Sequence, residues 1–303
     1  MLDAAPLHIH TPLLYSKRLE LQTGKNVYLK LEALQPSASF KLRGIGRLCQ
    51  CYAAEGYQQL VASSGGNAGI SVAYCGMKLG MPTTIFIPST SHQLFIDEIK
   101  TYGADVRITG RDWDSAHAAA LKYIEIHHAA YIPPFDHPMI WAGHATMVEE
   151  IAATGLRPDA IVAAVGGGGL ACGLLEGMHQ QGWVDVPLIA VETKGADSLY
   201  QSIQAQQIIS LEAVTSRATS LGVKRIAAHL FEWTQEHDIK VAVISDDEAE
   251  AGARAFAADK RILVELSAGA ALAMVYQNHP IIQQYQTIVV IVCGGVNTSF
   301  FEA

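Results

Sequence analysis

Lys41 is the residue whose type and position could most directly support covalent chemistry. It lies in the segment Pro36–Gly44, which follows an apolar run and opens a predicted helix. The positive end of a helix dipole disfavours a protonated amine, so the pKa of Lys41 should fall and the amine should be available as a nucleophile or base. A solvated surface lysine is the alternative interpretation, but the small polar and aromatic neighbours Ser39 and Phe40 argue against it.

Two glycine-containing turns follow predicted strands and precede predicted helices. The first, Ser63–Gly69, offers hydroxyls and backbone amides that could hold a carboxylate, although an ordinary tight turn with a helix cap has the same pattern. The second, Gly166–Gly169, could direct four backbone N–H groups at a phosphate. Glycines that permit close packing of a helix on a strand are the alternative interpretation of the second turn.

Cys293 follows the last predicted strand, Thr287–Val292. In open parallel sheets ligands bind at the carboxyl ends of the strands. The thiol could therefore be a neutral polar contact to a ring nitrogen, or only a buried filler of the core.

Glu192 ends another predicted strand and supports a different hypothesis. Together with Gly166, Gly168 and Ala171 it fits the pattern of a dinucleotide site, in which an acid binds the ribose. A nicotinamide-dependent oxidoreductase is therefore an open alternative, but it leaves the Lys41 segment unexplained.

Positioning these residues requires alternating strands and helices. Short β-branched apolar runs alternate with alanine-rich stretches whose apolar residues recur every three or four positions, which predicts an α/β fold with parallel sheets. Proline crowds the chain at Ile132–Pro138 and marks a crossing between two lobes. We expect a small domain at 35–136 and a large domain at 1–34 and 137–303. The predicted strands are 27–31, 60–62, 83–87, 106–108, 129–132, 160–165, 188–191, 241–244 and 287–292.

Composition excludes several classes of protein. With 303 residues, 50% of them hydrophobic and 17% charged, the chain can bury a core, so disorder is excluded. The net charge of -8 offers no basic face, so we expect neither a nucleic-acid nor a membrane partner. We read no signal peptide or membrane span and expect a cytoplasmic protein. The five cysteines contain no Cys-x-x-Cys pair, and the twelve histidines form no His-Glu-x-x-His motif.

Taken together, four motifs resemble those of the fold type II pyridoxal-phosphate enzymes, and their order spans nearly the whole chain. The most similar group is the L-serine and L-threonine dehydratase (ammonia-lyase) family, particularly its short members, which place cysteine before the last glycine pair. The resemblance implies a two-lobed α/β fold like that of tryptophan synthase β, with open, mostly parallel sheets flanked by helices. The motifs are Pro-Ser-x-Ser-Phe-Lys-x-Arg-Gly at 36–44, Ser-Ser-Gly-Gly-Asn-Ala-Gly at 63–69, Gly-Gly-Gly-Gly-Leu at 166–170 and Cys-Gly-Gly-x-Asn at 293–297.

The same resemblance implies a role for each motif. Lys41 would hold pyridoxal 5'-phosphate as an internal aldimine and would later remove the Cα proton of the substrate. Phe40 would flank the pyridine ring, and Asn67 would bind its 3-hydroxyl. Cys293 would face the ring nitrogen as a neutral partner, which favours elimination over transamination. The phosphate would bind to Gly166, Gly167, Gly168 and Gly169, and the substrate carboxylate to Ser63, Ser64, Gly65, Gly66, Asn67 and Ala68.

The implied reaction is β-elimination from L-serine, and from L-threonine, to pyruvate or 2-oxobutanoate plus ammonia. A non-catalytic amino-acid-binding relative is a further alternative. The resemblance also implies a homodimer and a monovalent cation such as K+. Gly65 stands where serine racemases carry a second base, so we expect weak racemisation; the chain ends soon after Asn297, so we expect no regulatory domain. The residues that match the family's cation site are Gly166, Glu192, Ala196, Ser198, Leu221 and Val223.

Overall fold

The computed structural model describes residues 4–302 of the chain. The chain divides into two compact units, one formed by Met1–Ile9 and Gln35–Gly143 and the other by His10–Leu34 and His144–Ala303. The expected assignment of 35–136 to a small domain and of 1–34 with 137–303 to a large one stays a prediction, because compactness alone does not show which segments fold independently.

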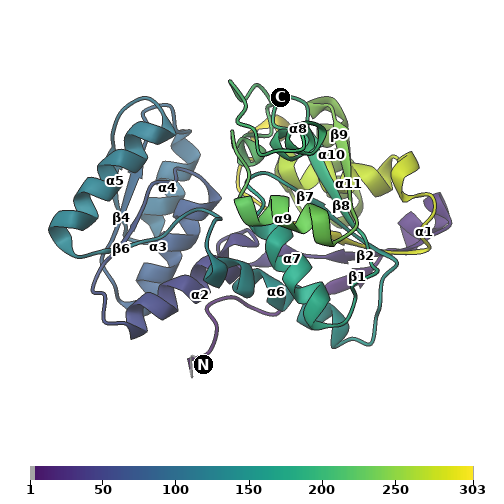
Figure 1. The fold of residues 1–303 in the computed structure, drawn as a ribbon, viewed down its shortest axis with the longest axis horizontal. Helices are drawn as coiled ribbons and strands as arrows, with labels where there is room; N and C mark the ends of the chain where they lie inside the picture. The colour runs from purple at the N-terminus through teal and green to yellow at the C-terminus, as the bar shows by residue number, and fades with distance from the viewer. Residues whose placement is uncertain (1–3, 303) are drawn as a thin grey trace. The chain divides into compact units, whose positions relative to one another are not determined.

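The first unit is built on a four-stranded sheet with the order β5-β4-β3-β6, in which every pair of neighbours is parallel. Helices α3 and α5 both pack on this sheet, and α2 and α4 pack on α3 (Figure 1). This is the arrangement that successive β-α-β units produce. The elements are β3 (Leu60–Ala62), β4 (Thr83–Ile87), β5 (Asp105–Ile108), β6 (Ala130–Tyr131), α2 (Lys41–Ala54), α3 (Asn67–Leu79), α4 (Gln93–Thr101) and α5 (Trp113–His127).

The second unit is built on a six-stranded sheet with the order β1-β2-β10-β7-β8-β9. Only the β1–β2 pair is antiparallel. Figure 1 shows α7 and α9 on one side of this sheet and α10 and α11 on the other. The strands are β1 (Leu13–Tyr15), β2 (Asn26–Lys30), β7 (Ala160–Ala164), β8 (Leu188–Thr193), β9 (Ile239–Ile244) and β10 (Thr287–Ile291). The helices are α1 (Lys17–Thr23), α6 (Pro138–Ala152), α7 (Gly169–Gln180), α8 (Ser198–Gln204), α9 (Ala228–Glu236), α10 (Asp246–Lys260) and α11 (Leu266–Tyr276), and α6 begins in the first unit.

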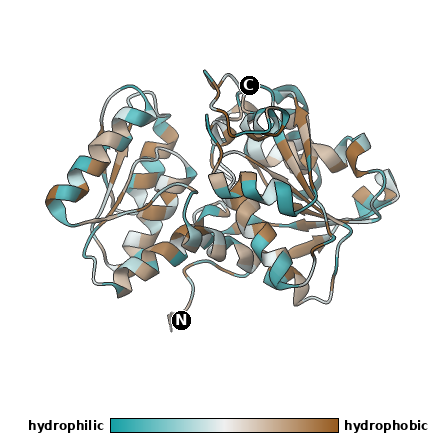
Figure 2. Cartoon of the chain, in the orientation of Figure 1, coloured by the Kyte–Doolittle hydropathy of each residue, from teal (hydrophilic) through white to brown (hydrophobic). Residues whose placement is uncertain are grey.

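The core of the second unit lies between its central strands and α11. Every residue of β7, β8 and α11 is buried, which is why these segments read as continuous apolar runs rather than alternating ones. Figure 2 shows the strands of both sheets in hydrophobic colours, while the helices carry hydrophilic residues on their outer sides. The lysine that ends β2, Lys30, is also fully buried, and its charge is compensated by an ion pair with Glu150 and a hydrogen bond to the Thr11 carbonyl.

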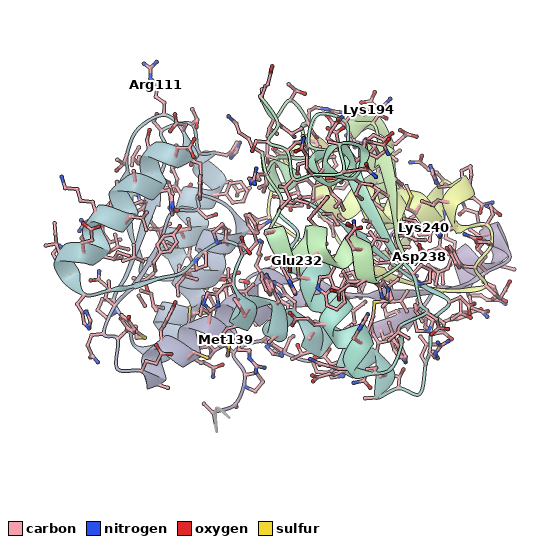
Figure 3. All side chains as sticks on the ribbon, in the orientation of Figure 1. Arg111, Met139, Lys194, Glu232, Asp238 and Lys240 are labelled. Atoms are coloured by element: carbon pink, nitrogen blue, oxygen red, sulfur yellow. The ribbon has the colours of Figure 1, made fainter. Side chains whose placement is uncertain are left out.

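The predicted strands correspond closely to β2–β10, whereas β1, an edge strand with no buried residue, was not predicted. Strands β5 and β9 are edge strands too, and each is only partly buried. At the start of β9, Asp238 and Lys240 form an exposed ion pair of 3.1 Å (Figure 3), and such charges discourage edge-to-edge pairing. Among the helices of residues 4–302, none combines the length and apolar character needed to cross a lipid bilayer.

Candidate active site

Lys41 is the first residue of α2, as the sequence predicted. Its Nζ donates a hydrogen bond of 2.6 Å to the carbonyl oxygen of Pro134. The same nitrogen lies 5.2 Å from the centre of the Phe40 ring and 5.9 Å from that of Phe135. The amine therefore lies within 6 Å of the centres of two aromatic rings, at the start of a helix and beside the segment that follows β6.

The loop Ser63–Ala68 follows β3 and leads into α3, which begins at Asn67. Ser63 is fully buried, and Asn67 is buried too. Gly65 packs against the end of β4: a Cβ at this position would approach the Ser91 Oγ to 2.4 Å. The loop is thus anchored at Gly65 and at its two buried ends, while Ser64 and Gly66 stay half-exposed and could offer donors to a ligand group.

Two serines connect this loop to the segment that carries Lys41. The Ser71 hydroxyl donates a hydrogen bond of 2.9 Å to the carbonyl oxygen of Asn67 and lies 3.0 Å from the hydroxyl of Ser37. The structure therefore brings the Lys41 segment and the Ser63–Ala68 loop together within the first unit. These predicted site residues, Phe40, Lys41, Ser63, Ser64, Gly65, Gly66, Asn67 and Ala68, all belong to that unit.

Two residues that sequence reasoning did not assign to the site contact this loop directly. The Tyr131 hydroxyl lies 2.7 Å from the Ser63 Oγ and 2.8 Å from the Nδ1 of His117. His117 was interpreted only as one of twelve histidines without a metal motif. No local pattern marks it, because it lies 54 residues from Ser63 along the chain.

In the second unit, Gly166–Gly169 connects β7 to α7. Gly168 has a φ of +95°, and no side chain caps α7. A Cβ at Gly168 would approach Leu230 to 2.6 Å, so both the conformation and the space require glycine there. Because the first amides of a helix have no intrahelical acceptor, this turn presents hydrogen-bond donors at the positive end of α7.

Cys293 lies on the same edge of the sheet as the glycine turn, because β10 and β7 are parallel neighbours and both features follow the carboxyl ends of their strands. The thiol is 4% exposed, and its sulfur lies 3.8 Å from the Ser267 hydroxyl. Ser267 in turn donates a hydrogen bond of 2.5 Å to the buried carboxyl of Glu265. This acid and serine were not predicted, since nothing in their local sequence distinguishes them from the start of a buried helix.

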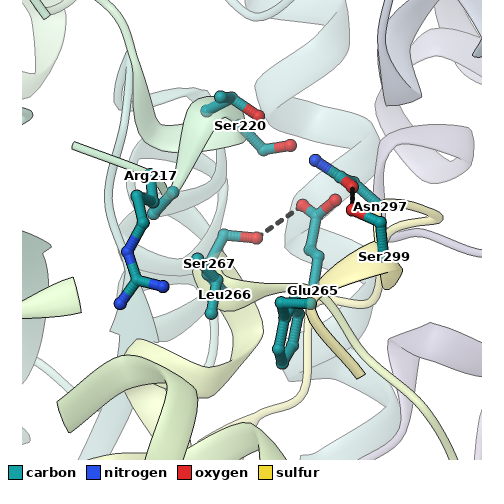
Figure 4. Close-up of a pocket in the computed structure, with 10 residues that line it drawn as sticks. Arg217, Ser220, Glu265, Leu266, Ser267, Asn297 and Ser299 are labelled. Carbon is teal, nitrogen blue, oxygen red and sulfur yellow. Dashed lines mark hydrogen bonds between the residues drawn. The ribbon is translucent and has the colours of Figure 1, made fainter. Parts of the chain in front are cut away.

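A cavity of about 230 Å³ opens beside this group. Figure 4 shows the polar ends of Glu265, Ser267, Asn297 and Ser220 directed toward a common space. Thr219 and Ser220 of the 3-10 turn Thr219–Leu221 form part of its wall. The last residue of this turn, Leu221, has its backbone against Gly166. The lining residues are Arg217, Ala218, Thr219, Ser220, Glu265, Leu266, Ser267, Asn297, Ser299 and Phe300.

Glu192 is the residue of the predicted cation site that has an ionisable side chain. It is fully buried, and its two carboxyl oxygens accept hydrogen bonds of 2.9 Å and 2.8 Å from the backbone N–H groups of Leu199 and Tyr200. Burial raises its pKa to about 8, although the two amide bonds oppose the shift. Because this carboxyl group is buried and both of its oxygens accept backbone hydrogen bonds, it is poorly placed to bind a ribose. The dinucleotide alternative therefore gains no support from Glu192.

The other predicted cation ligands lie in the same unit. A Cβ at Gly166 would be 3.0 Å from the Cα of Leu221, and Val223 donates its N–H to the Leu221 carbonyl at 2.7 Å. Ala196 forms a bridge with Thr193, and Ser198 begins α8 beside the amides that bind Glu192. Within residues 4–302, no three His, Cys, Asp or Glu side chains are grouped to hold a metal ion, so a cation here would depend mainly on backbone oxygens.

Comparisons with known proteins identify the family and the fold of the chain. Residues 5–294 match the family described as "Pyridoxal-phosphate dependent enzyme". The "L-serine dehydratase/L-threonine deaminase" of Bos taurus is 45% identical over 315 residues, covering 100% of this chain and 95% of the relative.

Two solved structures are similar over most of the chain. The L-serine ammonia-lyase of the fungus Rhizomucor miehei has a TM-score of 0.92 at 35% identity and covers 98% of this chain and 97% of its own. The processed form of threonine deaminase isoform 2 from Solanum lycopersicum has a TM-score of 0.88 at 28% identity and covers 97% and 82%. These matches confirm the predicted fold class, with its mostly parallel sheets flanked by helices. The chain therefore belongs to the pyridoxal-phosphate-dependent enzymes of fold type II.

Proposed function

We propose that this protein is an ammonia-lyase that eliminates the β-hydroxyl group of L-serine, and also of L-threonine, releasing ammonia with pyruvate or 2-oxobutanoate. The observation that carries the proposal is the placement of Lys41, a primary amine at the start of α2 and close to two aromatic rings, in a chain of this cofactor family. Relatives named as serine dehydratases and threonine deaminases support the choice of substrate.

The predicted cofactor residues fit pyridoxal phosphate by the chemistry of their donors. The amides of Gly166, Gly167, Gly168 and Gly169 suit a dianionic phosphate, since a helix N-terminus favours negative charge. The side chain of Phe40 offers an aromatic face for a ring, and the amide of Asn67 offers donors for a ring oxygen. Cys293 offers a neutral thiol rather than a carboxylate to the ring nitrogen.

Pyridoxal phosphate supplies, when bound, the electron sink that makes the Cα proton of an amino acid acidic. We propose that Lys41 removes this proton, because a primary amine can act as a general base. The Ser63–Ala68 loop binds and orients the substrate carboxylate through Ser63, Ser64, Gly65, Gly66, Asn67 and Ala68.

We further propose a monovalent cation at Gly166, Glu192, Ala196, Ser198, Leu221 and Val223. The support is the buried carboxyl of Glu192: burial raises its pKa, and a cation beside it would favour the ionised form. A cation bound there would compensate the carboxylate and would fix the Thr219–Leu221 turn against Gly166.

The protein as purified tests the assignment. We expect a yellow chromophore that borohydride abolishes, with the reduced cofactor covalently attached to Lys41, and release of ammonia from L-serine. A colourless protein that binds a nicotinamide cofactor would contradict the assignment and favour the oxidoreductase. Binding of serine with no release of ammonia would indicate a non-catalytic relative.

We also propose that the enzyme is a cytoplasmic homodimer. Partly exposed Leu14 and Tyr15 on the edge strand β1 support a protein partner, and the lack of disulfides among residues 4–302 suits a reducing compartment. Sedimentation of the holoenzyme gives the oligomeric state, and the mass of one chain, 32.6 kDa, would contradict the dimer.

A further inference from the structure

The hydroxyl of Ser91 occupies the space in which a side chain at position 65 would begin. A Cβ built on Gly65 would lie 2.4 Å from the Ser91 Oγ and 3.2 Å from the Cγ2 of Ile87. Ser91 closes the turn after β4, where its N–H donates a hydrogen bond of 3.1 Å to the Pro88 carbonyl. The Ser63–Ala68 loop therefore has a hydroxyl beside Gly65 that comes from another part of the chain.

Parallel strand pairing brings these two segments together. Strands β3 and β4 are parallel neighbours, so the loop after β3 and the turn after β4 leave the sheet at the same edge. Each segment leads into a helix, α3 from Asn67 and α4 from Gln93, and the two helices pack on each other. Ligands bind at the carboxyl ends of parallel strands, and helix N-termini at that edge favour an anion.

The Ser91 hydroxyl is accessible to solvent and is not used by the fold. Ser91, Ser64, Gly65 and Gly66 are all half-exposed. Among residues 4–302 the Ser91 Oγ has no hydrogen-bond partner, and the atom is not buried. The same is true of the Ser64 Oγ, which would lie 4.0 Å from a Cβ on Gly66. Two hydroxyls thus flank the Gly65–Gly66 backbone at a surface that a small ligand can reach.

These groups are hydrogen-bond donors without acceptors. A serine hydroxyl has one proton to donate, whereas a carboxylate only accepts. The backbone N–H groups of Gly65 and Gly66 also have no acceptor within the described part of the chain, residues 4–302. The hydroxyl of Ser91 therefore adds a side-chain donor to backbone donors that suit the same anion.

We propose that Ser91 is a further substrate-binding residue, whose hydroxyl donates a hydrogen bond to the carboxylate of the amino acid beside Gly65. This inference rests on the proposed function, because it takes the Ser63–Ala68 loop as the carboxylate site. The absence of a Cβ at position 65 lets Ser91 supply the polar side chain that the loop lacks there. Ser91 contacts the carboxylate and not the atoms between which bonds break.

Removal of the hydroxyl tests this contact. Ser91→Ala should raise the KM for serine about tenfold while kcat changes less than about twofold, because the carboxylate keeps its charge throughout the reaction. Ser91→Thr keeps a hydroxyl on Cβ and should stay within about threefold of the wild-type KM. Ser91→Gly also removes the hydroxyl and takes the place of Ser91→Ala if that variant does not fold. A wild-type KM in a folded variant without the hydroxyl would overturn the inference.

Two amines that differ in the carboxylate separate its binding from a change in loop shape. Glycine has the carboxylate but no β-hydroxyl, and ethanolamine is serine without the carboxylate. The Kd of each is followed by the absorbance of the bound cofactor. Ser91→Ala should weaken glycine binding about tenfold and change ethanolamine binding less than about twofold. Equal losses for the two amines would show that Ser91 only maintains the shape of the loop, and the inference would be wrong.

Ser89→Ala is the matched control. Ser89 lies in the same turn and is exposed, and its backbone N–H donates a hydrogen bond of 3.0 Å to the Gly110 carbonyl, which alanine retains. The KM for serine and the Kd for glycine should both stay at their wild-type values. An equal rise in KM for Ser89→Ala and Ser91→Ala would mean that the turn as a whole, and not the Ser91 hydroxyl, sets the affinity.

Failure of the proposed function has a different signature from failure of this inference. If the wild-type protein releases no ammonia from serine, but Ser91→Ala weakens glycine binding alone, the proposed function is contradicted and the carboxylate contact is supported. If the wild-type protein releases ammonia and Ser91→Ala binds glycine with wild-type affinity, the contact is contradicted and the proposed function stands.

Discussion

The amine of Lys41 donates a hydrogen bond of 2.6 Å to the carbonyl of Pro134, only three residues after the tyrosine that contacts Ser63. Strand β6 therefore ends in a segment that holds the proposed base through a backbone carbonyl and the proposed carboxylate loop through a phenol. Both contacts depend on the parallel pairing of β6 with β3. A displacement of this segment would affect the two functions together.

Lys41→Ala should abolish ammonia release from serine, because it removes both the cofactor attachment and the base. Lys41→Arg is the matched control: it keeps a positive charge at the start of α2, but a guanidinium remains protonated and is not a nucleophile. We expect both variants to be inactive in an ammonia assay and to retain the wild-type circular dichroism spectrum. Undiminished turnover in either variant would overturn the assignment of Lys41.

Gly65→Ala should lower kcat/KM for serine by about 5-fold to 150-fold, as expected for about 1–3 kcal/mol of overpacking. The added Cβ would approach the Ser91 Oγ to 2.4 Å and the Cγ2 of Ile87 to 3.2 Å, so the loop or its neighbours must shift. Ser91→Gly should restore part of the activity in the double variant, because it removes the nearest atom. Steady-state kinetics of the single and double variants decide the point, and a Gly65→Ala enzyme with wild-type constants would show that the loop has room to relax.

Ala38→Gly should stabilise the fold by about 0.5–1 kcal/mol. Ala38 has a φ of +58°, in the left-handed region that disfavours any residue with a Cβ, and it lies in the turn that leads to Lys41. Relief of this strain should outweigh the greater freedom of glycine in the unfolded chain. Ala251→Gly, at an exposed position within α10, should instead destabilise by about 1 kcal/mol. If the positive φ at Ala38 is the cause, urea unfolding should show a higher free energy of unfolding for Ala38→Gly and a lower one for Ala251→Gly.

The sequence predicted the features that depend on local pattern. Strand ends, the start of α2 at Lys41 and the glycine turn before α7 follow from apolar runs and from glycine placement, so their positions agree with the structure. The contacts of Ser63 with His117 and Tyr131 could not be predicted. These residues lie 54 and 68 positions after Ser63 along the chain, and they meet it only when three elements pack together. The Glu265–Ser267–Cys293 contacts have the same origin, since a buried acid is recognisable only once its surroundings are known.

Glu192 should make the stability of the protein depend on pH and on K+. Its pKa is raised by burial from 4.5 to about 8, so between these values the folded chain keeps a proton that the unfolded chain has lost. The neutral carboxyl is fully compatible with the fold below about pH 4.5, and the stability it contributes is lost as the pH rises toward 8. Glu192→Gln should therefore give a flatter dependence of the melting temperature on pH between about 4.5 and 8.

A cation bound beside Glu192 would favour the ionised carboxyl and oppose this loss. Potassium chloride should thus raise the melting temperature of the wild-type protein more at high pH than at low pH, because binding stabilises the folded state that carries the carboxylate. Tetramethylammonium chloride at the same ionic strength controls for screening. Glu192→Gln should lose most of the potassium-specific increase, since the glutamine keeps the side-chain shape but not the charge. The same increase in both proteins, or equal effects of the two salts, would mean that no monovalent cation is bound through Glu192.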